Sequence, residues 1–169
     1  MGYLPAALLN YLLLLSWAPG GNREIISKDE AIGLFDMKNV NKTAATFDLK
    51  KLDWVNNQYL KNADPQKLLE ELIPLLIERK YIVQENFNRE YILGLVKLFQ
   101  PRLSRLNDFL DWADFFFLED IQIDPAAAEQ FLGKDLSREL RLFIAELEKL
   151  EDFSIENIEK SFRDLVSKL

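Results

Sequence analysis

A short basic stretch around Trp54 carries residue types that contact nucleic acids. Read at about 100° per residue, residues 49–60 form a helix with apolar residues on one side and Trp54 on the other, among lysines. Lysine ammonium groups bind phosphates, and polar side chains beside them contact sugars or bases. The candidate contacts in and beside this helix are Lys42, Lys50, Lys51, Trp54, Gln58 and Lys61. The alternative interpretation is that Trp54 fills a gap under a neighbouring helix while the lysine stems lie along the surface.

Two arginines form a second candidate site, after the break that Gln100 and Pro101 make in a helical pattern. We expect a new helix to begin there, with Arg102 and Arg105 three residues apart on one side of its first turn. Positive side chains oppose the helix dipole at an N-terminus, at a cost of roughly a few tenths of a kcal/mol. Two arginines in the first turn therefore indicate a role that outweighs this cost. The two interpretations are contact with an RNA and pairing of each arginine with Asp108 or another nearby acid.

The distribution of charge permits a nucleic-acid partner although the net charge is −7. Residues 38–61 hold five lysines against two aspartates, and residues 91–107 hold one lysine and two arginines with no acid. From residue 108 to the end, sixteen acids stand against seven bases. Two basic segments in an otherwise acidic protein would fix the position of a bound RNA, and the acidic segments would repel the RNA elsewhere.

The sequence lacks the residues that a stand-alone enzyme or a metal site would need. It contains no histidine and no cysteine, which excludes the commonest general base, thiol nucleophiles and thiolate zinc sites. It has no glycine-rich phosphate loop, and its paired acids are typical of solvated faces of amphipathic helices. We therefore expect no catalytic residue, no metal ligand and no bound cofactor.

The segments that can be assigned follow the helical period, which predicts an all-α fold of two packed helical units. Asp64 and Pro65 are typical of an N-cap followed by proline at the first helical position. We therefore place the linker at about residues 61–65 and the domains at residues 1–63 and 64–169. Further helix starts are predicted at Ser27, Asp48, Asp124 and Ser154.

Two apolar segments are assigned to packing. Residues 6–18 are too short to span a bilayer, and no lysine or arginine precedes them. We expect a buried helix there, with Pro5 in its first turn and its end before Pro19. Trp112 and the phenylalanines at residues 115–117 lie between acids, a pattern more typical of a core than of stacking on bases.

Three spaced motifs carry a resemblance to a known family. The central motif consists of Thr43-Ala44-Ala45, Phe47-Asp48, Lys51-Leu52-Asp53-Trp54-Val55-Asn56 and Gln58-Tyr59-Leu60. It resembles the stem-contact region of bacterial-type glutamyl-tRNA synthetases. Upstream, Gly2-Tyr3-Leu4-Pro5 looks like the segment that follows the second ATP-site signature of that family. Downstream, Ala113-Asp114-Phe115-Phe116-Phe117 looks like a marker of its anticodon-binding part.

The resemblance implies the C-terminal tRNA-binding part of an ATP-dependent glutamate–tRNA ligase, with ATP and Mg²⁺ bound by a catalytic domain that this sequence lacks. Residues 1–63 would be a stem-contact domain. Residues 64–169 would be the helical-bundle-like anticodon-binding domain of a class I aminoacyl-tRNA synthetase. In the family the last helix is followed by a glycine-containing turn and further helices, so we expect the anticodon-binding surface to be incomplete in this sequence.

The resemblance also assigns roles to single residues and a partner, tRNA(Glu). Asn56 joins the RNA-binding candidates. Arg102, in Phe99-Gln100-Pro101-Arg102-Leu103, matches the arginine that contacts the third anticodon base and is associated with accepting glutamate tRNA while rejecting glutamine tRNA. We expect a monomeric, cytoplasmic protein of translation without membrane or DNA contacts. The alternative function is that of a helical protein–protein adaptor, which buries a helix of a partner protein between its own helices.

Overall fold

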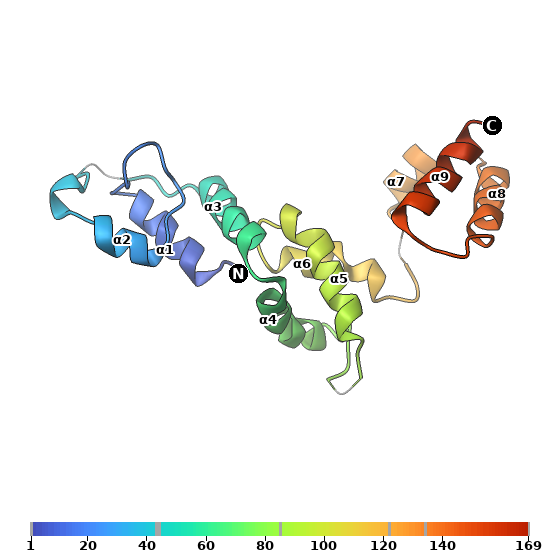
Figure 1. Cartoon of the computed structure of the whole chain (residues 1–169), viewed down its shortest axis with the longest axis horizontal. Helices are drawn as coiled ribbons and strands as arrows, with labels where there is room; N and C mark the ends of the chain where they lie inside the picture. The colour runs from blue at the N-terminus through green and yellow to red at the C-terminus, as the bar shows by residue number, and fades with distance from the viewer. Residues whose placement is uncertain (1, 43–44, 85, 122, 134, 169) are drawn as a thin grey trace. The chain divides into compact units, whose positions relative to one another are not determined.

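A computed structural model describes residues 2–42, 45–84, 86–121, 123–133 and 135–168. Within these ranges the chain forms helices and no β-strand, with an isolated β-bridge between Val83 and Asn86 (Figure 1). The predicted all-α fold is therefore confirmed. The helices are α1 (Pro5–Leu14), α2 (Lys28–Leu34), η1 (Met37–Asn39), α3 (Leu49–Asn62), α4 (Pro65–Glu78), α5 (Arg89–Phe99), η2 (Gln100–Arg102), α6 (Asp108–Trp112), η3 (Asp114–Phe116), α7 (Pro125–Leu132), α8 (Ser137–Leu147) and α9 (Ile155–Val166).

The chain divides into two compact units, unit 1 (Met1–Asp120) and unit 2 (Ile121–Leu169). The predicted linker at residues 61–65 lies inside unit 1, so the expected domain division at residues 63/64 is not a break between compact units. One physical reason for the missing break is that hydrogen bonds join the linker region to residues of the predicted second domain. The Gln100 side-chain amide donates to the carbonyls of Leu60 and Ala63 at 2.7 and 2.8 Å.

Side-chain caps begin four of the described helices at predicted positions. Ser27 and Glu30 form a capping box at the start of α2, in which each side chain satisfies a backbone N–H of the other residue. Three aspartates accept hydrogen bonds from the first turns of α3, α4 and α7, namely Asp48, Asp64 and Asp124. Ser154 precedes α9 as predicted, but its side chain makes no cap hydrogen bond.

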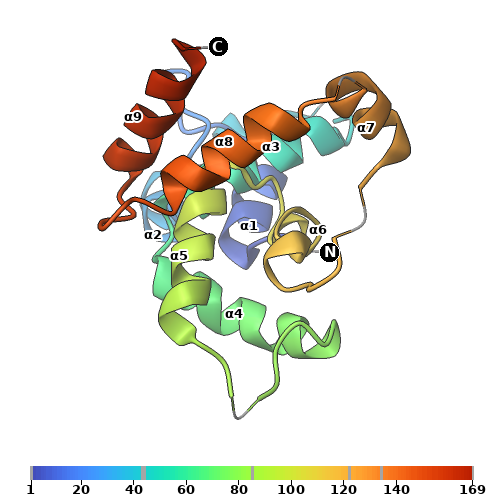
Figure 2. The ribbon, with the colours of Figure 1, turned by 90° about the vertical axis from the view of Figure 1, so that its right-hand side faces the viewer.

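The largest core of unit 1 lies among α4, α5, α6 and the end of α3. Figures 1 and 2 both show α4 beside α5. Leucines at helical spacing fill this core, and α4 continues through Pro74 to Glu78. A smaller cluster joins α1 to α3 through Ala7, Tyr11 and Val55. Because both clusters hold α3 from its apolar side, the opposite side of α3 is left for solvent or a ligand.

Helix α1 is only half buried, which corrects the prediction of a buried helix. Ala7 and Tyr11 are buried against α3, and the helix ends at Leu14, several residues before the expected limit. A helix whose partners cover only one side leaves the opposite face uncovered. The exposed residues of that face are Leu8, Leu9 and Leu12.

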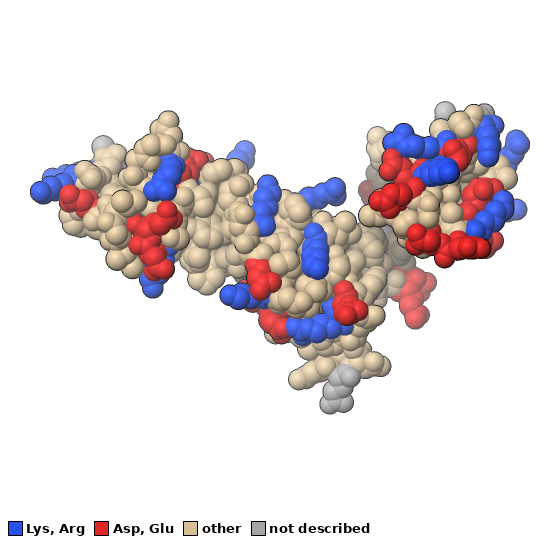
Figure 3. Space-filling model, viewed as in Figure 1, with Lys and Arg blue, Asp and Glu red and all other residues tan. Residues whose placement is uncertain are grey.

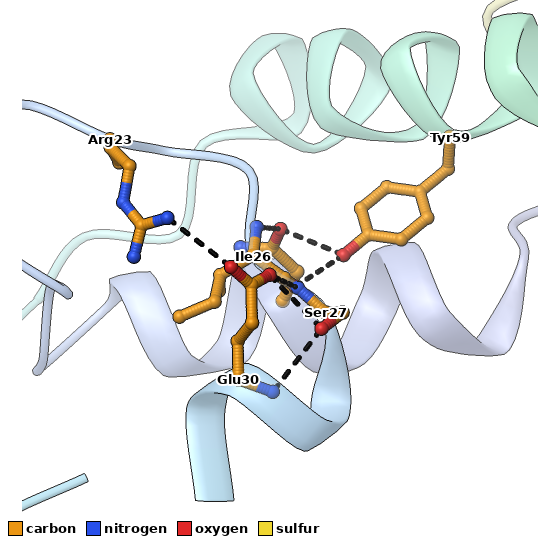
Figure 4. A network of polar contacts seen from close by, with 6 residues as sticks. Arg23, Ile26, Ser27, Glu30 and Tyr59 are labelled. Carbon is orange, nitrogen blue, oxygen red and sulfur yellow. Dashed lines mark hydrogen bonds and ion pairs between the residues drawn. The ribbon is translucent and has the colours of Figure 1, made fainter. Parts of the chain in front are cut away.

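A buried amide joins α1 to the following loop and to α3. Asn10 accepts a hydrogen bond from the Ile26 backbone N–H at 2.9 Å and donates to the Glu24 carbonyl at 2.9 Å. The Tyr59 hydroxyl of α3 donates to the Ile26 carbonyl at 2.6 Å (Figure 4). Burial raises the pKa of the Tyr59 phenol, so this group remains a donor at neutral pH. These contacts fix the loop before α2 against α3.

The aromatic cluster at residues 112–117 is only partly core. Phe117 stacks on Tyr81 with ring centroids 5.2 Å apart, and Phe116 meets Phe99 edge to face at 6.0 Å. Trp112 and Phe115 are nearly half exposed. The packing prediction is confirmed for Phe116 and Phe117, whereas the other two side chains remain accessible.

Unit 2 is built from three amphipathic helices, α7, α8 and α9. Phe143 of α8 meets Phe162 of α9 edge to face with ring centroids 5.4 Å apart. No described residue of this unit is buried, although apolar residues recur along each helix. Across the described parts of both units, no helix is long and apolar enough to cross a membrane.

Candidate nucleic-acid interface

Two lysines and a tryptophan lie on one exposed stripe of α3. At 100° per residue, Lys50, Trp54, Asn57 and Lys61 fall within an arc of about 60°, and the stripe is about 16 Å long at 1.5 Å per residue. We call these four residues the α3 stripe. Lys50 and Lys61 are exposed, and neither makes an ion pair with any residue that the structure describes. Figure 3 shows separate basic groups over the α3–α5 part of unit 1.

Lys51 lies beside this stripe and has partners within the protein. Its Nζ is 2.5 Å from Oε2 of Glu24 and 4.2 Å from the centroid of the Trp54 ring. A cation over an aromatic face is attracted by the ring quadrupole. The Lys51 ammonium lies over one face of the Trp54 ring, and Trp54 is 41% exposed, so part of the ring remains accessible. Lys51 is therefore a weaker candidate for a phosphate contact than Lys50.

The structure corrects the assignment of Asn56 to RNA contact. Its side chain is fully buried, with an exposed fraction of 0%. Its Oδ1 accepts a hydrogen bond from the Leu4 backbone N–H at 2.8 Å, and its Nδ2 donates to the Ser104 carbonyl at 2.6 Å. A buried amide whose donor and acceptor are both used serves packing. Asn56 ties the chain before α1 and the loop after η2 to α3.

One of the two candidate arginines is paired and the other is not. Nε of Arg105 is 3.3 Å from Oδ1 of Asp108, and the Arg105 backbone N–H donates to the same carboxylate at 2.8 Å. Arg102 is exposed and makes no ion pair within the described ranges. The pairing interpretation thus holds for Arg105, and Arg102 keeps its donors for a ligand.

The arginines do not lie on the first turn of an α-helix, which corrects the prediction for this segment. Arg102 ends η2, Arg105 lies in the following loop, and α6 begins only at Asp108. Leu103 between them has an extended backbone, with φ −66° and ψ 129°. The helix-dipole argument therefore does not apply, and the backbone carbonyls of this loop take hydrogen bonds from α3 instead.

Asn57, which was not predicted from the sequence, contacts the turn that carries Arg102. Asn57 Nδ2 donates to the Leu103 carbonyl at 2.7 Å and to the Pro101 carbonyl at 3.4 Å. Gln58 Nε2 donates to Asn57 Oδ1 at 3.3 Å, so Gln58 also has a partner on α3. The available signal was the run of three amides at residues 56–58 on an otherwise amphipathic helix.

An acidic residue of α3 is engaged by a tyrosine. Asp53 Oδ1 accepts a hydrogen bond from the Tyr3 hydroxyl at 2.6 Å. Burial and then this hydrogen bond raise the pKa of the Tyr3 phenol above its ordinary value, so the proton stays on the phenol at neutral pH. The described residues include no group of three or more acids that could hold a metal ion.

Comparison with known proteins identifies the family. The family model of the anticodon binding domain matches residues 67–169, which is more than half of the chain. The chain belongs to the anticodon-binding domain family. A second family model, that of the catalytic domain of class I tRNA synthetases (E and Q), matches residues 1–54.

The first match bears out the expected resemblance to the tRNA-binding part of a synthetase. The second match adds that residues 1–54 are similar to the model of a catalytic domain. This range contains α1, α2, η1 and the first six residues of α3, together with the lysines at positions 42, 50 and 51. Of the central motif, Thr43 and Ala44 lie outside the described residues.

Similar proteins include glutamate–tRNA ligases. Those of Bacillus licheniformis and Caldicellulosiruptor saccharolyticus are 34% and 36% identical over 165 and 162 residues. Each alignment covers 96% of this chain, which spans about a third of the length of these curated relatives. The crystal structure of a glutamate–tRNA ligase from Elizabethkingia meningosepticum, in complex with its amino acid, aligns with a TM-score of 0.83 at 30% identity. That alignment covers 99% of this chain and 32% of the other.

Proposed function

We propose that the chain binds tRNA(Glu) as the anticodon-recognising part of a glutamate–tRNA ligase. The observation that carries the proposal is the position of Arg102, exposed and without an ion pair in the described structure, beside the α3 stripe. Lysines of the stripe would contact phosphates, and Arg102 would contact a base of the anticodon loop. Membership in the anticodon-binding domain family and the similarity to glutamate–tRNA ligases support this assignment. The protein would act as a monomer in the cytoplasm, as part of translation.

The proposal is tested by titrating a fluorescently labelled tRNA(Glu) transcript with the chain at several salt concentrations. Three of the candidate lysines make no ion pair in the described structure and are available to phosphates: Lys42, Lys50 and Lys61. Each neutralised phosphate contributes roughly 0.7–0.9 to the slope of log affinity against log salt, so we expect a slope of about −2.5. An affinity that does not change between low and physiological salt would contradict the proposal, as would equal binding of a DNA duplex.

Two adjacent lysines provide a sharper comparison. We expect Lys50→Ala to reduce the salt slope by roughly one unit and to weaken all tRNAs alike, because Lys50 is exposed and unpaired in the described structure. The matched variant Lys51→Ala should have a smaller effect, because the Lys51 charge is already compensated by Glu24. The measurement is fluorescence anisotropy of both variants across salt. Equal losses for the two lysines would show that the Lys51 ion pair opens on binding and that the assigned difference is wrong.

We also propose that this chain alone neither activates glutamate nor binds ATP, and that ATP and Mg²⁺ belong to other parts of the ligase. The support is chemical, because the sequence has no histidine and no glycine-rich phosphate loop, although residues 1–54 match a catalytic-domain model. We expect no glutamate-dependent pyrophosphate exchange by the purified chain above the protein-free blank. Exchange that requires both glutamate and the chain would show that residues 1–54 retain catalytic function.

A further inference from the structure

The turn that carries Arg102 is held from α3 on both sides of that residue. The two hydrogens of the Asn57 Nδ2 amide face the carbonyls of Pro101 and Leu103, at 3.4 and 2.7 Å. These are the residues immediately before and after Arg102. One side chain of α3 therefore bridges backbone carbonyls on both sides of Arg102, one in the peptide group that precedes Arg102 and one in the peptide group that follows Leu103.

Neighbouring contacts keep Asn57 and the turn in place. Gln58 Nε2 donates to Asn57 Oδ1 at 3.3 Å, which fixes the Asn57 amide with its donors toward the turn. Leu103 is fully buried, and the Gln100 amide donates to the Leu60 and Ala63 carbonyls at the end of α3. Residues 100–103 thus have little freedom to move apart from α3, although Arg102 itself is exposed.

The same helix also carries the two lysines of the α3 stripe. Asn57 lies between Lys50 and Lys61 on that stripe, at about 20° and 40° from them in helical projection. A contact between RNA phosphates and the stripe would therefore place the Arg102 turn at a fixed distance from the RNA backbone. Fixed placement of a recognition group favours discrimination because a displaced guanidinium cannot form two parallel hydrogen bonds.

We propose that Asn57 is a positioning residue for Arg102, and that it couples phosphate binding by α3 to base discrimination without itself contacting the base. This inference rests on the proposed function, since it requires Arg102 to contact an anticodon base. It differs from a general packing role in what it predicts. Loss of the Asn57 amide lowers the discrimination between bases and leaves the phosphate-dependent salt slope unchanged.

The test uses the whole chain and two tRNA(Glu) transcripts, one with the natural cytosine and one with guanine at the third anticodon position. The discrimination ratio is the quotient of the two affinities. Asn57→Ala should lower this ratio several-fold, toward the ratio of the Arg102→Gln variant, with an unchanged salt slope. The matched control is Asn62→Ala on the same helix, whose amide donates to the Gln58 carbonyl and not to the turn, and it should keep the wild-type ratio.

A double variant and a second substitution complete the design. Asn57→Ala combined with Arg102→Gln should lower the ratio no further than Arg102→Gln alone, because both changes remove the same interaction. If Asn57→Ala lowers helical content, Asn57→Leu provides the comparison, because it keeps a similar shape and removes the donor without adding a charge. A wild-type ratio in the folded Asn57 variant, while Arg102→Gln loses discrimination, would overturn this inference and leave the proposed function intact. A wild-type ratio in Arg102→Gln would instead overturn the proposed base contact itself.

Discussion

Replacing Arg102 with glutamine is expected to remove most of the discrimination between anticodons that differ at the third base. Glutamate and glutamine codons differ in their first base, so their tRNAs carry cytosine and guanine respectively at the third anticodon position. The Watson–Crick edge of cytosine offers two adjacent acceptors, which suit the two parallel donors of a guanidinium. The same edge of guanine presents two N–H donors, which repel it. Loss of one such contact costs ~1–3 kcal/mol of discrimination, or about 5- to 150-fold in the affinity ratio.

The measurement is the affinity ratio of the two transcripts for the wild-type chain and the variant, at one fixed salt concentration. Arg105→Gln is the matched control, because Arg105 lies three residues away but is paired with Asp108. We expect this control to keep the wild-type ratio. An Arg102→Gln variant with an unchanged ratio would identify Arg102 as a phosphate contact or a solvated side chain. Loss of discrimination in Arg105→Gln alone would mean that the two arginine assignments must be exchanged.

Leu95→Ala is expected to destabilise unit 1 by about 2–5 kcal/mol. Leu95 of α5 is 5% exposed and packs in the core shared by α4, α5 and α6. Truncation removes buried apolar surface and leaves a cavity that the surrounding helices fill only in part. The measurement is urea unfolding followed by circular dichroism, with the change in midpoint converted through the slope of the transition.

Leu98→Ala on the same helix is the matched control for this prediction. Leu98 is 56% exposed, so the same chemical change removes little buried surface. Its effect should stay within about 0.5 kcal/mol, as for surface substitutions in general. Equal losses of stability in the two variants would mean that α5 buries a different face from the one described.

The helix starts were predictable because their signals are local. An aspartate or serine before a helix accepts hydrogen bonds from backbone N–H groups two or three residues ahead, so spacing in the sequence is sufficient. The caps at Ser27, Asp48, Asp64 and Asp124 were found in this way. The segment after Pro101 failed because its conformation depends on partners more than 40 residues away. The carbonyls of this segment accept hydrogen bonds from side chains of α3, so they do not need the N–H partners of a helix. No local sequence pattern indicates such distant partners.

The candidate site shows the same division between local and distant information. Helical projection correctly placed Lys50, Trp54 and Lys61 on the exposed side of α3. It could not distinguish Lys51, whose charge is compensated by Glu24 from the loop before α2. It also could not show that Asn56 is buried by two segments that fold back onto α3. Partners of polar side chains depend on tertiary contacts, which a single sequence does not reveal.

The central claim is that the α3 stripe and the turn that carries Arg102 bind RNA. Lysine acetylation with and without tRNA tests this claim most directly. The chain is treated with an acetylating reagent in the absence and in the presence of saturating tRNA(Glu), and modification of each lysine is quantified by mass spectrometry. The account predicts that tRNA protects Lys50 and Lys61 at least several-fold, while Lys28 of α2 and Lys80 after α4 are modified equally in both samples. Unchanged modification of Lys50 and Lys61 in the complex, with protection at Lys28 or Lys80 instead, would contradict it.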